Sequence, residues 1–318
     1  MPWFQQSHDQ QPMTSDSRTL TASIGVAVSG VLWGVFWMPV RYMESQSLGG
    51  PWPSIVFFGA TILMVIPIAL MSWRSLIRNT LEIVIIGLLC GGAFALYIVS
   101  LLLTDVVKAI LMFYLTPAWS TLGVWLLYRT RVTWSRIAVL VCGFGGLWVI
   151  LGAGSGIPWP TGAGDWMALV SGICWAGGSM YLYRGARSSH TEQLLAFSLG
   201  GLVLTGAVLP LLPTDSIALP QPVDWQPLKV GVLLAVVMLP ANWLVLWAAG
   251  RLEPARVGIL LMMEVVVGVI TAAIFAGEPF TWREGLGAGL IVAAGLFEVA
   301  QQTTPAPSSN QLAGSGER

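Results

Sequence analysis

The sequence contains very little charge. Only 9% of its 318 residues are Asp, Glu, Lys or Arg, against roughly 25% in soluble domains. So few charged side chains cannot cover the surface of a water-soluble protein of this length. The 15 basic and 15 acidic residues balance, so the chain also lacks the positive surface that nucleic-acid binding requires. These absences exclude a soluble protein and give no support to a nucleic-acid partner.

Histidine and cysteine are also scarce. The two histidines, His8 and His190, fall in a polar stretch and a short connection, so a histidine-based metal site is not expected. The three cysteines, Cys90, Cys142 and Cys174, lie inside apolar runs. Their spacing is not that of a disulfide or a zinc site, and we expect them to pack as small core residues. No nucleotide-binding Walker A pattern occurs, so the sequence predicts no cofactor and no enzymatic activity.

One short motif resembles that of a membrane aspartyl protease, Gly162-Ala163-Gly164-Asp165. Such catalysis needs two facing aspartates that share a proton. The other candidate, Asp105, is expected in a loop. We therefore expect Asp165 to cap the N-terminus of the helix that follows it.

Apolar sequence is abundant and falls into long runs. Hydrophobic residues make up 55% of the chain, in stretches of about 20, the length that crosses a hydrocarbon core of about 30 Å as an α-helix. Barrel strands would be shorter and would alternate in polarity. The sequence therefore predicts an all-α integral membrane protein with ten transmembrane helices. The expected spans are 20–40, 53–73, 82–103, 107–128, 135–153, 164–184, 192–212, 228–249, 255–275 and 282–301.

The polar segments between and around these spans predict the topology. Residues 1–19 and 302–318 are expected to be disordered cytoplasmic tails, and prolines mark 213–226 as an extended connection. With the N-terminus in the cytoplasm, most basic residues fall on the inner side, as the positive-inside rule requires. The four on the outer side are Arg41, Lys108, Lys229 and Arg283. Both termini are therefore expected in the cytoplasm, in a multi-pass protein.

The two halves of the chain resemble each other. Ser-Gly-Val-Leu-Trp-Gly at 29–34 matches Ser-Gly-Ile-Cys-Trp-Ala at 171–176, and Thr-Trp-Ser-Arg at 133–136 matches Thr-Trp-Arg-Glu at 281–284. Chance similarity between Gly- and Trp-rich helices is the alternative explanation. A true duplication predicts two five-helix repeats, residues 20–153 and 164–301. Because five is odd, the second repeat is inverted in the membrane, an arrangement that supports alternating access around a central site.

The second half carries a family resemblance. Met263-Glu264-Val265 followed by 277–282, Gly-Glu-Pro-Phe-Thr-Trp, resembles the Leu-Glu-Pro run and Gly-Glu-Arg-Leu-Thr turn of EamA-like transporters, in the drug/metabolite transporter superfamily. In the first half, Leu115-Thr116-Pro117 stands in place of Leu-Glu-Pro, and the Gly-Glu turn is replaced by 129–133. The second half thus keeps the acid of the Leu-Glu-Pro run, as Glu264, and the first half keeps its proline, as Pro117. The resemblance implies a carrier of the bacterial inner membrane, often an exporter, for amino acids or other small metabolites.

Glu264 is the principal candidate for a transport residue. It falls near the middle of the ninth expected helix, where an ionised carboxylate costs about 2.5–3.5 kcal/mol. In one interpretation it faces a central cavity, where desolvation favours its protonated form and allows proton coupling, or where it pairs with a cationic group of the substrate. In the other, it is a protonated acid that only hydrogen-bonds neighbouring helices.

Other polar and aromatic residues at membrane depth complete the predicted substrate site. Trp33 and Trp175 occupy matching repeat positions and are candidate cavity walls, although ordinary packing is the commoner role of such tryptophans. Asn242 can orient a ligand or bond another helix. Trp37 and Tyr114 are further candidates for substrate contact.

Helix distortions and small residues suggest how the helices move and pack. Pro117 is the best hinge candidate among the prolines within helices. The glycine pairs 30/34, 87/91 and 285/289 have the spacing that lets helices approach closely. We expect packing within the chain, with a homodimer as the alternative. A channel, or a structural membrane protein without coupled transport, remains the alternative to a carrier of small molecules.

Overall fold

The computed structural model describes residues 12–46, 48, 50–104, 106–128, 132–151, 160–212, 225–275, 277 and 280–300. All regular secondary structure in these residues is helical. Residues 1–11, 302–318 and 213–224, which belong to the expected tails and the expected extended connection, lie outside the described part, as do Asp105 and residues 129–131.

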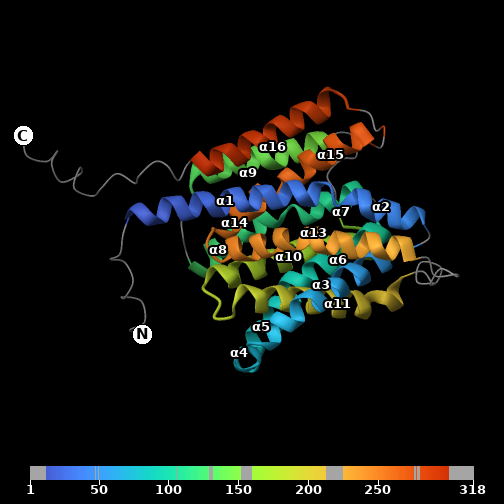
Figure 1. Cartoon of the computed structure of the whole chain (residues 1–318). Helices are drawn as coiled ribbons and strands as arrows, with labels where there is room; N and C mark the ends of the chain where they lie inside the picture. The colour runs from blue at the N-terminus through green and yellow to red at the C-terminus, as the bar shows by residue number, and fades with distance from the viewer. Residues whose placement is uncertain are drawn as a thin grey trace, which may run out of the picture.

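The helices of the first half occupy its five expected spans (Figure 1). Helix α1 begins at Pro12, so it extends further toward the N-terminus than the hydrophobic run and into the predicted tail. A π-helical turn, η1, joins α5 to α6. The bounds are α1 (Pro12–Gly34), α2 (Trp37–Ser45), α3 (Trp52–Leu70), α4 (Trp73–Arg78), α5 (Thr80–Ile86), η1 (Gly87–Gly91), α6 (Gly92–Leu103), α7 (Val106–Phe113), α8 (Thr116–Tyr128) and α9 (Trp134–Leu151).

The second half repeats this order with fewer short pieces. A single turn of 3-10 helix, η2, follows α11. The bounds are α10 (Ala163–Tyr183), α11 (His190–Val208), η2 (Leu209–Leu211), α13 (Trp225–Ala249), α14 (Pro254–Leu261), α15 (Met263–Phe275) and α16 (Trp282–Ala300).

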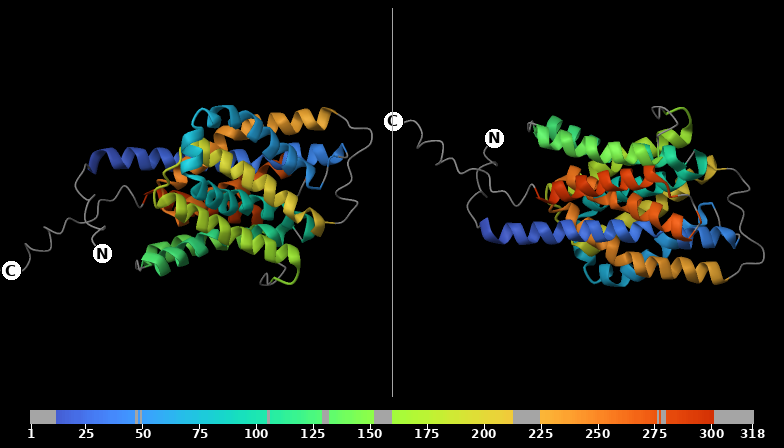
Figure 2. Two further views of the ribbon diagram at one scale, coloured as in Figure 1. Left: turned by 90° about the horizontal axis from the view of Figure 1, so that it is seen from below. Right: turned by 90° about the horizontal axis from the view of Figure 1, so that it is seen from above.

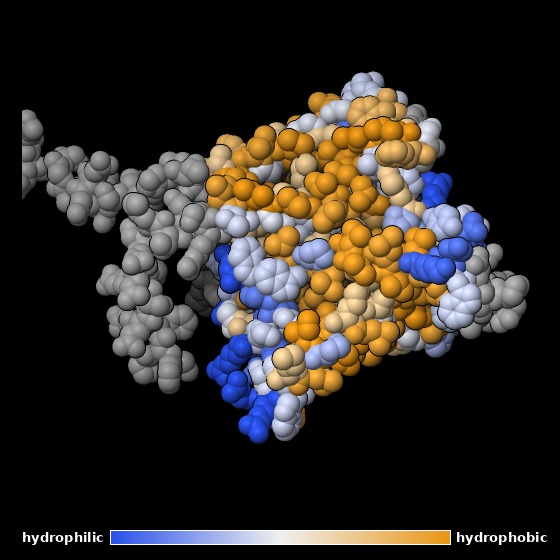
Figure 3. All heavy atoms as spheres, viewed as in Figure 1, coloured by the Kyte–Doolittle hydropathy of each residue, from blue (hydrophilic) through white to orange (hydrophobic). Residues whose placement is uncertain are grey.

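Length and hydropathy mark much of this bundle as membrane-embedded. Within the described residues, seven helical stretches are long and apolar enough to cross a bilayer: 19–45, 52–70, 80–100, 109–126, 190–208, 225–249 and 254–275. Figure 3 shows hydrophobic residues across the middle of one face, with hydrophilic residues gathered toward its two ends. Large apolar side chains such as Leu63, Leu126 and Val141 are exposed on the surface. A hydrocarbon environment, not water, suits such a surface.

Two of the expected spans are broken near their middle. Helix α7 stops at Phe113 and α8 begins at Thr116, with Pro117 in its first turn, where a missing N–H costs no hydrogen bond. In the second half, α14 stops at Leu261 and α15 begins at Met263. These breaks occur in the fourth and ninth expected spans, which are corresponding members of the two halves. The structure thus contains a related pair of discontinuous helices.

Helix contacts follow one scheme in both halves. Helix α6 packs on α10, and its counterpart α13 packs on α1. Helix α10 packs on α7 and α8, and α1 packs on the counterparts α14 and α15. The corresponding helices α9 and α16 lie side by side at the edge of the bundle (Figures 1 and 2). Helix α1 begins and α16 ends at the same end of the bundle (Figure 1).

Two of the glycine pairs serve packing within the chain. A Cβ atom on Gly34 would come within 2.7 Å of the backbone oxygen of Glu264, and one on Gly91 would overlap the backbone oxygen of Phe197. These glycines therefore let α1 approach α15 and η1 approach α11, as predicted for packing within the chain. Gly289 differs, because nothing lies within 4 Å of its Cβ position.

Candidate functional site

Glu264 lies where the two broken helices meet. It occupies the first turn of α15, and its Oε2 accepts a hydrogen bond of 2.6 Å from the hydroxyl of Tyr114, in the turn between α7 and α8. The same hydroxyl lies 3.3 Å from the backbone oxygen of Leu261, at the end of α14. One side chain from the first half thus binds both sides of the break in the second half. The positive end of the α15 dipole also favours a negative charge on Glu264.

A small cavity adjoins this pair. Its volume is about 10 Å³, which is about the space that the centre of one water molecule needs. Helices from both halves contribute its walls. The lining residues are Trp33, Phe94, Phe113, Tyr114, Trp175, Phe197, Asn242, Val245, Leu246, Leu261 and Glu264.

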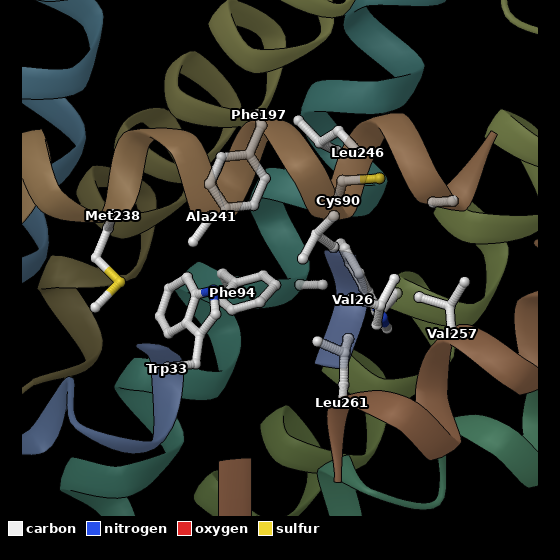
Figure 4. Close-up of a cluster of buried hydrophobic side chains, with 14 of the residues drawn as sticks. Val26, Trp33, Cys90, Phe94, Phe197, Met238, Ala241, Leu246, Val257 and Leu261 are labelled. Atoms are coloured by element: carbon white, nitrogen blue, oxygen red, sulfur yellow. The ribbon is translucent and has the colours of Figure 1, made fainter. Parts of the chain in front are cut away.

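Aromatic rings form most of the cavity wall. Phe94 lies at the centre of the group, with its ring centroid 4.9 Å from that of Trp33 and 5.3 Å from those of Trp175 and Phe197. Figure 4 shows Trp33, Phe94 and Phe197 converging from different helices. Such edge and tilted contacts stabilise a rigid apolar wall. Apolar walls with a few polar groups are typical of small-molecule sites.

Two hydrogen-bond donors of the lining residues are buried without partners. Trp175, on α10, and Asn242, on α13, are only 2% and 4% exposed. The Trp175 Nε1 and Asn242 Nδ2 atoms have no hydrogen-bond partner in the described part of the chain. A buried donor left unpaired costs about 1–3 kcal/mol, so their position beside the cavity needs an explanation.

The structure brings most of the predicted site residues together. Glu264, Trp33, Trp175, Asn242 and Tyr114 all line the cavity. Trp37 lies outside this group. Its Nε1 donates a 3.0 Å hydrogen bond to the hydroxyl of Thr271, which ties α2 to α15.

Pro117 lies at the break between α7 and α8, beside another close approach. A Cβ atom on Gly258 would come within 2.9 Å of the Pro117 ring, so α8 and α14 are in tight contact. A hinge at this proline would therefore move against the broken helix of the other half.

Three phenylalanines of the wall were not predicted as site residues: Phe94, Phe113 and Phe197. All three lie in almost continuously apolar runs, where the sequence contains no signal for the inward face. Phe94 follows the π-helical turn. Such turns often occur at functional sites, but the sequence pattern does not reveal them.

Asp165 has a capping role, as the sequence predicts, but it lies inside the first turn of α10 and not before the helix, where Gly162 is the N-cap residue. Its Oδ2 accepts hydrogen bonds from the backbone nitrogens of Thr161 and Gly162, at 2.7 and 3.1 Å, at the start of α10. Its other oxygen accepts from the Thr104 hydroxyl. Asp165 therefore caps α10 and links it to the end of α6.

A separate charged group lies where α9 begins and α16 ends. Arg136 donates to Glu253 and, at 2.8 Å, to Glu298. Arg256, which is 1% exposed, donates a 2.8 Å hydrogen bond to the Ser23 hydroxyl. These side chains connect α9 with α14 and α16, and α14 with α1.

A bundle of apolar helices, two of them broken around a cavity with one carboxylate, defines a membrane protein of the transporter class. The chain belongs to the EamA-like transporter family, which matches residues 20–152 and again 162–298. The resemblance to this family is thereby confirmed.

Individual relatives match a smaller part of the chain. The threonine/homoserine exporters RhtA of Escherichia coli (strain K12) and Salmonella typhimurium (strain SL1344) are each 28% identical over 166 residues, which cover 51% of this chain and 52% of the exporter. The chain thus spans about half the length of the curated relatives it matches. One solved crystal structure, 19% identical, has a TM-score of 0.69 over 90% of this chain and 97% of its own, which shows a shared fold.

Proposed function

We propose that this protein is a secondary carrier, an exporter of amino acids or related small metabolites across the bacterial inner membrane. The observation that carries the proposal is the Glu264–Tyr114 contact beside a cavity where discontinuous helices of both halves meet. In carriers, substrates bind near the membrane midplane at such breaks. The naming of RhtA as a threonine/homoserine exporter supports the substrate class.

The proposed topology has ten crossings in two inverted repeats, residues 20–153 and 164–301, with both termini in the cytoplasm. The matching helix contacts of the two halves support it, because the contacts of α1 with α13, α14 and α15 correspond to those of α10 with α6, α7 and α8. The arrangement of the basic residues supports the orientation. Exchange of conformations between such halves opens the cavity first to one side and then to the other.

The size of the cavity limits how a solute can pass. A volume of about 10 Å³ cannot contain an amino acid. Solute passage then requires the aromatic walls to separate. A carrier separates them on one side at a time, whereas a channel would open to both sides at once.

Counterflow in liposomes tests the proposal. Purified full-length protein is reconstituted, the vesicles are loaded with one unlabelled L-amino acid at a time, and uptake of the same labelled amino acid is measured. A carrier gives a transient, saturable accumulation of label that depends on the internal amino acid. Uptake that is linear in concentration and independent of the internal pool would show a channel. No uptake of any of the 20 common amino acids would overturn the substrate class.

A further inference from the structure

The unpaired donors beside the cavity indicate what kind of group a ligand must present to them. The Trp175 indole and the Asn242 amide approach from α10 and α13, which are separate helices, and line the same cavity as the Glu264 carboxylate. Both nitrogens are buried and lack a partner within the described residues. Buried polar groups in native proteins are nearly always satisfied. Several other buried polar atoms also lack a partner within the described residues, but only Trp175 and Asn242 among them line the cavity.

We infer that Trp175 Nε1 and Asn242 Nδ2 form a subsite that binds the carboxylate of an α-amino acid, while Glu264 binds its ammonium group. The inference rests on the proposed function and assigns the polar groups of its site. A carboxylate offers about four lone-pair positions, so it can accept from both nitrogens at once. Hydrogen bonds to a charged acceptor are also stronger than those to a neutral one.

The two polar parts of the site have opposite preferences. The Oε2 atom of the Glu264 carboxylate already accepts a hydrogen bond from Tyr114. The carboxylate can only accept hydrogen bonds, so it favours a donor such as an ammonium group. The indole N–H of Trp175 can only donate a hydrogen bond, so it favours an acceptor such as a carboxylate. A ligand that has an ammonium and a carboxylate on the same carbon satisfies both parts. A simple amine leaves the two nitrogens unpaired, as they are in this structure.

The rest of the cavity fits the side chain of such a ligand. Phe94, Phe113 and Phe197 offer only apolar surface, so they provide no hydrogen bond to a third polar group. Discrimination is therefore expected to be strict for the amino and carboxylate groups and loose for the side chain, because apolar walls distinguish ligands differing by one methylene only weakly.

The test uses binding, which does not depend on transport. The 20 common L-amino acids are titrated calorimetrically into the purified full-length protein, and the tightest binder is compared with its own carboxamide, in which the carboxylate is replaced by a neutral amide. Trp175→Phe and Asn242→Leu each remove one hydrogen-bond donor and put an apolar side chain of similar shape in its place. Trp166→Phe is the matched control, because Trp166 lies on the same helix α10 and is 52% exposed.

The wild-type protein is expected to prefer the amino acid over its carboxamide by at least about tenfold. Trp175→Phe and Asn242→Leu should each reduce that preference severalfold, while Trp166→Phe should leave it unchanged. Equal weakening of both ligands by the two site variants, or an unchanged preference, would overturn the inference and leave the proposed function intact. Binding with the expected preference but without counterflow would overturn only the proposed function.

Two further outcomes are decisive. If the wild-type protein binds no amino acid, the carboxylate subsite is wrong. If either site variant fails to fold, as judged by its elution in size-exclusion chromatography, Asn242→Asp replaces it. The added negative charge should then weaken the amino acid much more than its carboxamide, and equal weakening of the two would contradict the subsite.

Discussion

At the scale of single residues, the question is how the bundle tolerates the Glu264 carboxylate. Two features stabilise its ionised form: the Tyr114 hydroxyl at 2.6 Å and the positive end of the α15 dipole, which contributes about 0.3–1 kcal/mol. An ionised carboxylate at the centre of a membrane helix costs about 2.5–3.5 kcal/mol. The helix break is therefore part of the site, because it places a helix N-terminus at membrane depth.

Glu264→Gln tests whether Glu264 couples transport to protons, which is one of the roles that its position in the sequence predicts. Glutamine keeps the shape and can accept from Tyr114, but it cannot carry a proton through the transport cycle. We expect amino-acid flux driven by a pH gradient to fall at least about tenfold. Exchange without a gradient, measured at a saturating amino-acid concentration that offsets weaker binding of the ammonium group, should fall much less. Both are measured in proteoliposomes.

The matched control for this variant is Glu44→Gln, on the exposed surface of α2, which should change neither flux. Gradient-driven flux in Glu264→Gln equal to that of the wild type would exclude Glu264 as the coupling residue. The structural interpretation of Glu264, as an acid that only bonds helices, would then be favoured.

Residue types at unusual positions made part of the cavity predictable. A lone acid, an amide and tryptophans in apolar runs are detectable without a structure, and Glu264, Asn242, Trp33 and Trp175 all line the cavity. Trp37 has the same residue type, yet it bonds Thr271 outside the cavity. The direction in which a tryptophan points depends on tertiary packing, and helices that are apolar on all sides do not encode it.

At the scale of helices, hydrophobic runs predicted where helices occur but not where they break. The break beside Pro117 had a sequence signal, because proline disfavours the interior of a helix. The break at Met262 has no proline or glycine beside it. The glycines at the two ends of η1 predict close helix packing but not a π-helical turn. Such distortions depend on contacts with neighbouring helices, which form only in the folded bundle.

The close packing of η1 on α11 leads to a prediction about the stability of the protein. Gly91→Ala places a methyl group against the backbone oxygen of Phe197, and a backbone atom cannot rotate away. We expect a loss of about 1–3 kcal/mol in unfolding free energy, as for other overpacked sites. Thermal unfolding of the detergent-solubilised protein measures it.

Gly59→Ala in α3 is the matched control, because nothing lies within 4 Å of its Cβ position. The alanine should be neutral or slightly stabilising there, since alanine is the better helix former. If both variants melt at the same temperature as the wild type, then η1 and α11 are not in such close contact.

At the scale of the whole molecule, charged side chains connect the two halves at one end of the bundle. Arg136 comes from the first half, and its partners Glu253 and Glu298 come from the second. Glu298 is 5% exposed, so removal of Arg136 takes away the cation that this buried carboxylate contacts. Loss of one partner of a buried pair costs about 3–5 kcal/mol.

Arg136→Met should therefore lower the unfolding free energy by about that amount. The double variant Arg136→Met/Glu298→Met should recover part of the loss, since it removes the buried Glu298 carboxylate together with the arginine that it contacts. Arg78→Met, an exposed position in α4, is the control and should be neutral. Thermal unfolding again provides the measurement. Equal loss in the single and double variants would mean that packing by the arginine stem, not its charge, holds this end together.

The inverted topology predicts on which side of the membrane two matching segments of the chain lie. Ser135, in the first turn of α9, and Thr281, directly before α16, lie in the matching segments 133–136 and 281–284. If the repeats are inverted, the two positions face opposite sides of the membrane, with Ser135 on the cytoplasmic side. The native cysteines 90, 142 and 174 are first replaced by alanine, and Ser135→Cys or Thr281→Cys is then introduced singly.

In intact cells, a membrane-impermeant maleimide should label Thr281→Cys and not Ser135→Cys, and permeabilised cells should show labelling of both. The two sites make a matched pair, because each lies one residue from a tryptophan at the start of its helix. Labelling of both in intact cells would place them on the same face. The repeats would then be parallel, and exchange of conformations between the halves could no longer open the Glu264 cavity to alternate sides.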